Sequence, residues 1–80
     1  MQQAIRFRLS LSAEEFLRYY QGQVRQIQVI SEGGRTIRFP AAALRPYLTH
    51  SGIHGRFEIR FDDNNKFTDM AMIEKDEQGE

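Results

Sequence analysis

A single short helix with a defined start and stop limits what the rest of this 80-residue chain can form. Ser12 and Glu15 have the spacing of a capping box, in which each side chain bonds the other residue's backbone N–H at a helix N-terminus. Gly22 is predicted to end this helix in the left-handed conformation that glycine adopts readily. The rest of the ordered chain is therefore predicted to consist mainly of strands and turns.

Apolar and polar residues alternate along several short stretches, which is the pattern of a strand with one buried face. The alternation is clearest over residues 56–61, clear over 5–11 and 35–39, and imperfect over 24–30 and 67–73. Turns at residues 31–34 and 62–65 contain the glycine, asparagine and aspartate that hairpins favour. Pro40 is predicted to end the third strand and to begin a short helical turn over residues 41–44.

The order of these elements predicts an α+β domain with a mainly antiparallel five-stranded sheet. One helix lies between strands 1 and 2, and the helical turn lies between strands 3 and 4. Periodicity does not give the strand order, so a curled open sheet and a small open barrel both remain. The domain is expected over residues 1–73, and residues 74–80 are expected to form a disordered acidic tail.

Composition excludes several classes of protein. The chain has no cysteine, which rules out a disulfide framework and a thiolate metal site. Its longest apolar run, residues 40–44, is too short to span a membrane. Arg6 and Arg8 interrupt the N-terminal region where a signal peptide would have a continuous apolar segment. We therefore expect a cytoplasmic protein without a membrane partner.

Charge is distributed unevenly although the formal net charge is zero. Residues 1–60 contain nine arginines and four acids (9 − 4 = +5), and residues 61–80 contain two lysines and seven acids (2 − 7 = −5). Such asymmetry is a hint about partners. One hypothesis is that residues 74–80 fold over an arginine-rich surface and screen it.

A resemblance to known proteins rests on five segments, residues 16–22, 34–41, 44–47, 49–57 and 61–67, and extends from Ile5 to Ile73. These segments resemble a family of small gammaproteobacterial proteins, the domain of unknown function 2835 family. The resemblance implies a stand-alone, cytoplasmic bacterial protein. It brings no established activity, so there are no catalytic residues to transfer to this chain.

No residue set predicts a catalytic, cofactor or metal site. His50 and His54 are imaginable metal ligands with Asp62 or Asp63, but their spacing crosses glycines and not a helix face. They are better explained as loop residues that form hydrogen bonds or face solvent. Residues 62–65 lack the glycine and the distal glutamate of a calcium loop. The sequence therefore predicts a protein that is not an enzyme.

Arginines at outward strand positions are the remaining candidate site. These residues are Arg6, Arg8, Arg38, Arg56 and Arg60. If their strands are neighbours, they form a surface for an anionic partner such as single-stranded nucleic acid, with Tyr19 or Tyr47 near its edge. The alternative is a solvated face whose arginines pair with Glu58 and Glu32. The second interpretation is favoured because the sequence pI is 6.7, well below that of typical nucleic-acid-binding domains.

The functional prediction is a non-enzymatic protein-interaction or self-associating module. Edge strands offer unpaired backbone groups that a partner can bind. The first and fifth strands are the predicted edges, and their pairing between two chains would make an isologous homodimer. Weak nucleic-acid binding through the arginine face is the alternative. Neither the partner nor the role of Met70 and Met72, in the core or at an interface, follows from the sequence.

Overall fold

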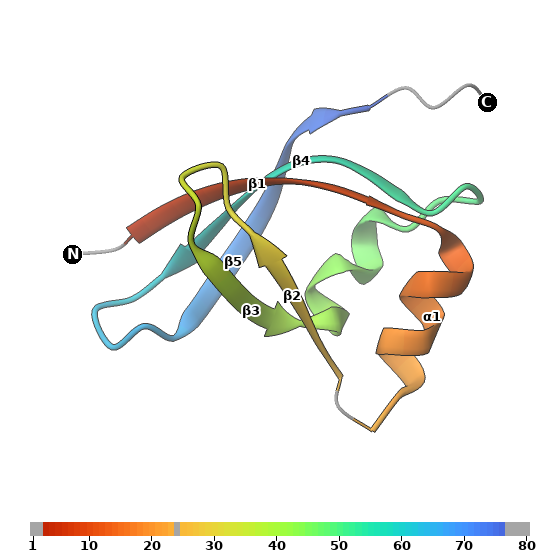
Figure 1. The fold of residues 1–80 in the computed structure, drawn as a ribbon, viewed down its shortest axis with the longest axis horizontal. Helices are drawn as coiled ribbons and strands as arrows, with labels where there is room; N and C mark the ends of the chain where they lie inside the picture. The colour runs from red at the N-terminus through yellow and green to blue at the C-terminus, as the bar shows by residue number, and fades with distance from the viewer. Residues whose placement is uncertain (1–2, 24, 77–80) are drawn as a thin grey trace.

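The computed structural model describes residues 3–23 and 25–76, which form five strands, one α-helix and one 3-10 helix (Figure 1). In chain order these are β1 (Gln3–Leu11), α1 (Ala13–Gln21), β2 (Gln26–Ile30), β3 (Thr36–Pro40), η1 (Ala41–Tyr47), β4 (Ile53–Phe61) and β5 (Phe67–Lys75). The predicted α+β class and the order of elements are confirmed. No helix in the described part of the chain is long and apolar enough to cross a membrane.

The strands form two antiparallel sheets and not the single five-stranded sheet that was predicted. One sheet has the order β1–β4–β5, and the second is the β2–β3 hairpin. The Glu32 N–H donates to the Arg6 carbonyl oxygen at 2.8 Å, which holds the hairpin turn against β1. Beyond this contact β2 runs away from β1 and packs against α1, so the two strands do not form a ladder (Figure 1).

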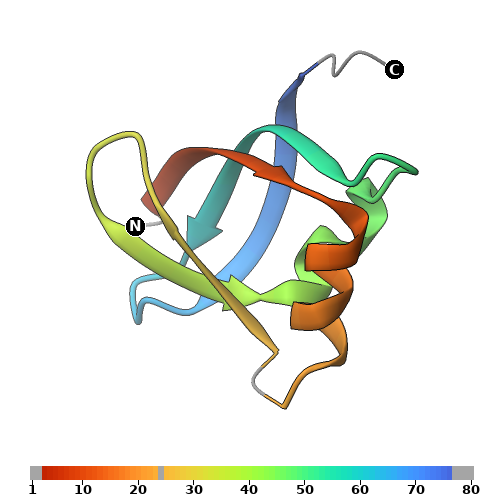
Figure 2. The same ribbon diagram turned by 45° about the vertical axis from the view of Figure 1, so that its right-hand side comes forward.

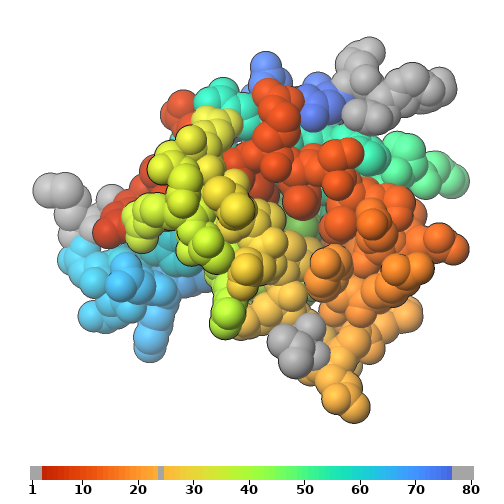
Figure 3. All heavy atoms as spheres, in the orientation of Figure 1, coloured from red at the N-terminus to blue at the C-terminus, as the bar shows by residue number. Residues whose placement is uncertain are grey.

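Both sheets enclose one hydrophobic core. Phe7 of β1 lies at its centre, with its ring 5.5 Å from that of Phe57 on β4 and 5.3 Å from that of Phe39 on β3. The two helices close the interior, with Phe16 of α1 and Leu44 of η1 fully buried. The strands curl round this interior (Figure 2), and the hairpin sits against β1 and α1 without a gap (Figure 3).

The helix α1 starts and ends where predicted, with Gly22 as its C-cap, but the predicted left-handed conformation of Gly22 is wrong. Ser12 Oγ accepts a hydrogen bond from the Glu15 N–H at 3.1 Å, and Glu15 Oε1 accepts one from the Ser12 N–H at 3.0 Å. Gly22 has φ −76° and ψ 175°, which is extended and not left-handed. A Cβ there would lie 2.8 Å from the Arg18 carbonyl oxygen. Glycine therefore ends this helix because it allows a close backbone approach.

Several element boundaries differ from the prediction, and three of them lie after β3. η1 extends to Tyr47 and includes Pro46. β4 begins at Ile53, which lies opposite Leu11 of β1. Gly55 lets the β5 backbone come close, because a Cβ there would lie 2.5 Å from the Glu74 carbonyl oxygen. β5 continues to Lys75, and Asp76 N–H donates to the His54 carbonyl oxygen. The first part of the predicted tail is therefore ordered, and residues 77–80 lie outside the described residues.

β5 is irregular because two register shifts interrupt its pairing with β4. They leave Ile73 and Thr68 without a partner in the ladder. Met70 and Met72 pack against the core. Flexible thioether side chains suit the irregular space beneath a bulged strand.

Candidate functional site

Four of the five predicted arginines share the outer face of the β1–β4–β5 sheet. Arg8 lies opposite Arg56 in the β1–β4 register, and Arg6 lies opposite Glu58. Arg60 lies two residues beyond Glu58 on the same face of β4. Arg38 is on β3, in the other sheet, and its Nε donates to Gln28 Oε1 at 3.0 Å. The structure therefore brings together four members of the set and separates the fifth.

Carboxylates pair with each of these four arginines. Glu58 accepts from both Arg6 and Arg60, at 3.1 and 3.0 Å. Glu32, at the hairpin turn, accepts two hydrogen bonds from Arg56, of which that from Arg56 Nη2 to Glu32 Oε1 measures 2.8 Å. The remaining pairs are Arg8 with Glu74 and Asp76, and Arg60 with Asp69. These contacts confirm the predicted pairing with Glu58 and Glu32.

This arrangement leaves the sheet face without excess positive charge. Four arginines and five carboxylates give 4 − 5 = −1. Hydrogen bonds from Arg6 and then Arg60 lower the pKa of Glu58 below its ordinary value, and Arg56 does the same for Glu32. The hydrogen bonds that Arg8 donates to Asp76 and Glu74 raise the pKa of Arg8 further above its already high value. The face is an ion-pair network at neutral pH.

The two histidines have separate environments. Nε2 of His54 lies 2.8 Å from the Ser51 carbonyl oxygen, and Nδ1 lies 2.8 Å from Ser10 Oγ. Because a carbonyl only accepts, Nε2 carries the proton in that bond. His50 is exposed on the loop. Within residues 3–23 and 25–76, no group of three metal-ligating side chains is close enough to hold an ion.

β1 and β5 are the edges of the three-stranded sheet, as predicted, but both edges are obstructed. The hairpin turn covers the middle of β1 through the Glu32–Arg6 backbone bond. The Tyr47 hydroxyl donates to the Met70 carbonyl oxygen at 3.2 Å on β5. The register shifts in β5 further interrupt any regular row of donors and acceptors.

The sequence pattern does not reveal a further feature, the free edge of β3. In an antiparallel ladder, residues that exchange hydrogen bonds alternate with residues whose N–H and C=O point away from the partner strand. Bonds from Ser31 N–H to Arg35 O and from Ala41 N–H to Arg25 O fix this alternation at both ends of the hairpin. The backbone groups of Thr36 and Arg38 therefore point away from β2, and both residues are exposed.

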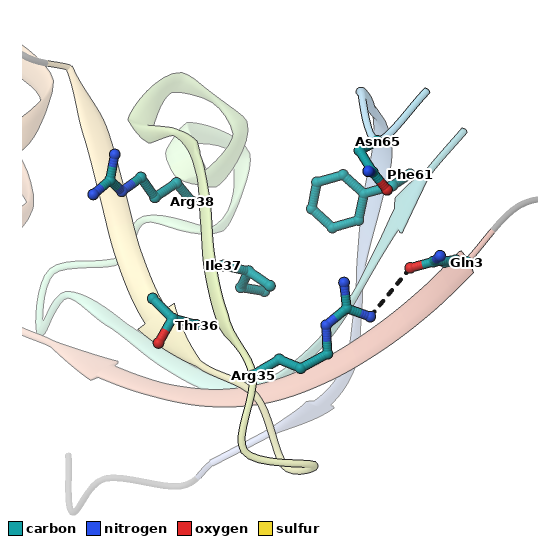
Figure 4. A pocket seen from close by; sticks show the side chains of 7 residues that line it. All are labelled: Gln3, Arg35, Thr36, Ile37, Arg38, Phe61 and Asn65. Carbon is teal, nitrogen blue, oxygen red and sulfur yellow. Dashed lines mark hydrogen bonds between the residues drawn. The ribbon is translucent and has the colours of Figure 1, made fainter. Parts of the chain in front are cut away.

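A shallow pocket of about 190 Å³ lies beside this free edge, where β3 faces the end of the other sheet (Figure 4). Ile37 and Phe61 supply its apolar surface, and Arg35 donates across it to Gln3 Oε1 at 3.2 Å. Asn65 contributes from the β4–β5 turn, where it has a left-handed φ of 63°. Finding this site requires the strand order, because its residues come from three separate segments.

The fold and these surfaces define a small α+β domain in which two antiparallel sheets share one core. The chain belongs to the family described as "Protein of unknown function (DUF2835)", whose model matches residues 3–73. The family membership expected from the sequence segments is thereby confirmed. No curated protein and no solved structure matches the chain.

Proposed function

We propose that this protein is a non-enzymatic, cytoplasmic interaction module that binds an extended segment of another protein along the free edge of β3. The observation that carries the proposal is the outward direction of the Thr36 and Arg38 backbone groups. An extended peptide can satisfy such groups by adding one strand to a sheet. Pro40, which has no N–H, ends the usable edge.

The charge at this edge favours a different chain over a second copy of this one. Arg35 and Arg38 lie three residues apart and bond only neutral amide side chains within the described residues. Pairing β3 with β3 of a second copy would gather four guanidinium groups, and like charges on neighbouring strands are destabilising. Pairing through β1 and β5, the homodimer considered from the sequence, would have to displace the contacts that obstruct those edges.

Nucleic-acid binding by the arginine face is the second candidate function. Its support is the convergence of Arg6, Arg8, Arg56 and Arg60 on one sheet face. A polyanion would have to displace the carboxylates of five acidic residues that already bond these arginines. Phosphate binding gains affinity by neutralising charge and releasing counterions, and this face has no excess positive charge to contribute. The free edge of β3 is therefore the better-supported site.

Substitution of Arg38 by proline tests the proposal. The Arg38 N–H points away from β2, so proline removes a donor from the free edge without removing a bond of the β2–β3 ladder. Peptides would be selected from a random phage-displayed library on the unmodified protein. Affinities would then be measured by fluorescence polarisation for the unmodified protein, Arg38→Pro and Arg38→Val, the control that keeps the N–H.

The expected result is about tenfold weaker binding to Arg38→Pro than to Arg38→Val, because a peptide carbonyl loses its donor. Circular dichroism and a urea melt would establish that both variants fold. The proposal is wrong if no selected peptide distinguishes the two folded variants, or if the selection yields no peptide.

A further inference from the structure

We infer that the pocket beside β3 is a carboxylate subsite, which takes an acidic group from the C-terminal end of the segment that adds to β3. This inference rests on the proposed function and specifies the chemistry of its partner. The carboxylate comes either from the end of a chain or from an aspartate or glutamate side chain, and the experiment below separates these two sources.

Strand direction places the C-terminal end of the partner at the pocket. The pocket includes Arg35, which directly precedes β3, and Thr36, the first residue of β3. Antiparallel pairing is slightly more stable per residue than parallel pairing. A segment that runs antiparallel to β3 has its C-terminal end beside the start of β3, next to the Arg35 guanidinium.

Arg35 has the donors that such a group requires. Arg35 Nη1 donates to Gln3 Oε1. Unlike Arg8 and Arg56, Arg35 makes no ion pair within the described residues. A guanidinium presents planar donors that match a carboxylate in a bidentate arrangement. A carboxylate carries a full negative charge and can accept two parallel bonds from the guanidinium, so it competes well with the neutral Gln3 amide, which accepts one. Figure 4 shows the Arg35 guanidinium beside Gln3, while that of Arg38 points away from Phe61.

The size and surface of the pocket fit one side chain or one chain end. Its volume of about 190 Å³ is below the range of roughly 300–1,000 Å³ typical of sites for drug-sized ligands and cofactors. Ile37 and Phe61 provide an apolar surface for the methylene groups or the flanking residue of the acidic group. The amide of Asn65 supplies a further polar contact at the rim.

The nearby acid Asp62 does not compete for Arg35. Its Oδ1 accepts from the backbone N–H groups of Asn64 and Lys66 at 2.8 and 3.0 Å, within its own turn. These bonds, that from Lys66 first, lower the pKa of Asp62.

A peptide fits the whole surface better than a nucleic acid does. The free edge of β3 presents carbonyl oxygens as well as N–H groups, and these carbonyls would repel phosphate. An extended peptide offers the complementary alternation of donors and acceptors.

The experiment uses the full chain and the peptides selected above. Each peptide is made as the free acid, as the C-terminal amide, and with its aspartates and glutamates replaced by asparagine and glutamine. Binding is measured for the unmodified protein, Arg35→Gln and Arg18→Gln. Arg18 lies on α1, outside the pocket, so its replacement makes the same change in net charge without altering the subsite.

We expect Arg35→Gln to weaken binding of the acidic peptide about tenfold, a loss of about 1.4 kcal/mol, and Arg18→Gln to change it little. If Arg35→Gln no longer weakens binding of the C-terminal amide, the carboxylate is the end of the peptide chain. If it no longer weakens binding of the form with asparagine and glutamine, the carboxylate is an aspartate or glutamate side chain. If Arg35→Gln weakens the acidic and neutral peptides equally, or weakens neither, the subsite is refuted. A continued difference between Arg38→Pro and Arg38→Val would then show that strand addition itself still holds.

Discussion

At the scale of single residues, Gly52 shows how one backbone position joins distant parts of the chain. It has φ +114°, and a Cβ there would lie 2.0 Å from the Leu11 carbonyl oxygen. The sequence marks residues 49–55 as a glycine-containing loop, but it does not show that this loop passes against the end of β1. The requirement for glycine therefore arises from packing and from backbone conformation together.

Gly52→Ala is expected to lower the free energy of unfolding by at least about 2 kcal/mol, because alanine is strained at this φ and its methyl group meets the backbone. Gly33→Ala is the matched control, since its Cβ would meet only Ser31 Oγ, at 3.9 Å. Urea melts of both variants give the comparison. Equal midpoints for the two variants would contradict the role assigned to Gly52.

At the scale of elements, the sequence predicts the local signals and the hairpin pairings, but not the pairings between elements distant in the chain. The capping box of α1 and the turn at residues 31–34 depend on residues close together in the chain, and both were predicted. The division into two sheets depends on where β2 leaves β1, which no local pattern records. The candidate site could not be predicted for the same reason. The alternation at residues 35–39 predicts a strand, but it does not show that one edge of this strand stays unpaired.

The ion pairs that join β1, β4 and the hairpin predict loss of stability in acid. Hydrogen bonds from Arg6 and Arg60 lower the pKa of Glu58, and Arg56 lowers that of Glu32. A carboxylate with a lower pKa in the folded state stabilises the fold above its unfolded pKa, and this contribution is lost as the pH falls through the folded value. The free energy of unfolding should therefore decrease as the pH falls below about 4.5.

Glu58→Gln should reduce this dependence without abolishing it, because Glu32 and Asp62 also have lowered pKa values. Urea midpoints measured from neutral to acidic pH provide the test. Glu14→Gln, on α1 and away from the sheet, is the control and should keep the dependence of the unmodified protein. An identical pH profile for Glu58→Gln and the unmodified protein would count against the assignment.

At the scale of the whole molecule, the separation of charges distinguishes the two functional candidates. The outer face of the three-stranded sheet has its arginines neutralised, whereas Arg35, just before β3, and Arg38 of β3 bond only neutral amides within the described residues. Acids from residues 61–80, which carry a net charge of −5, contact arginines from residues 1–60, which carry +5, on this sheet face. Glu74 and Asp76 contact Arg8, as expected if the C-terminal segment screens this face.

Light scattering coupled to size exclusion, at low and high salt, tests this charge arrangement. We expect the mass of one chain, 9.4 kDa, at both salts and no shift on adding a single-stranded oligonucleotide. The combined variant Glu32→Gln, Glu58→Gln and Glu74→Gln changes the face from 4 − 5 = −1 to 4 − 2 = +2. It should bind the oligonucleotide at low salt only, because binding to phosphates weakens as salt rises.

Each outcome of these measurements on the unmodified protein and on this variant supports a different function. A shift already present in the unmodified protein would favour nucleic-acid binding over strand addition, because the polyanion would then displace the carboxylates unaided. A dimer that persists at high salt would support self-association through apolar edge contacts, since screening weakens exposed charge pairs but not buried apolar area. A monomer that binds the oligonucleotide only after removal of the carboxylates would show that the ion-pair network keeps the sheet face closed to polyanions, leaving the edge of β3 as the accessible site.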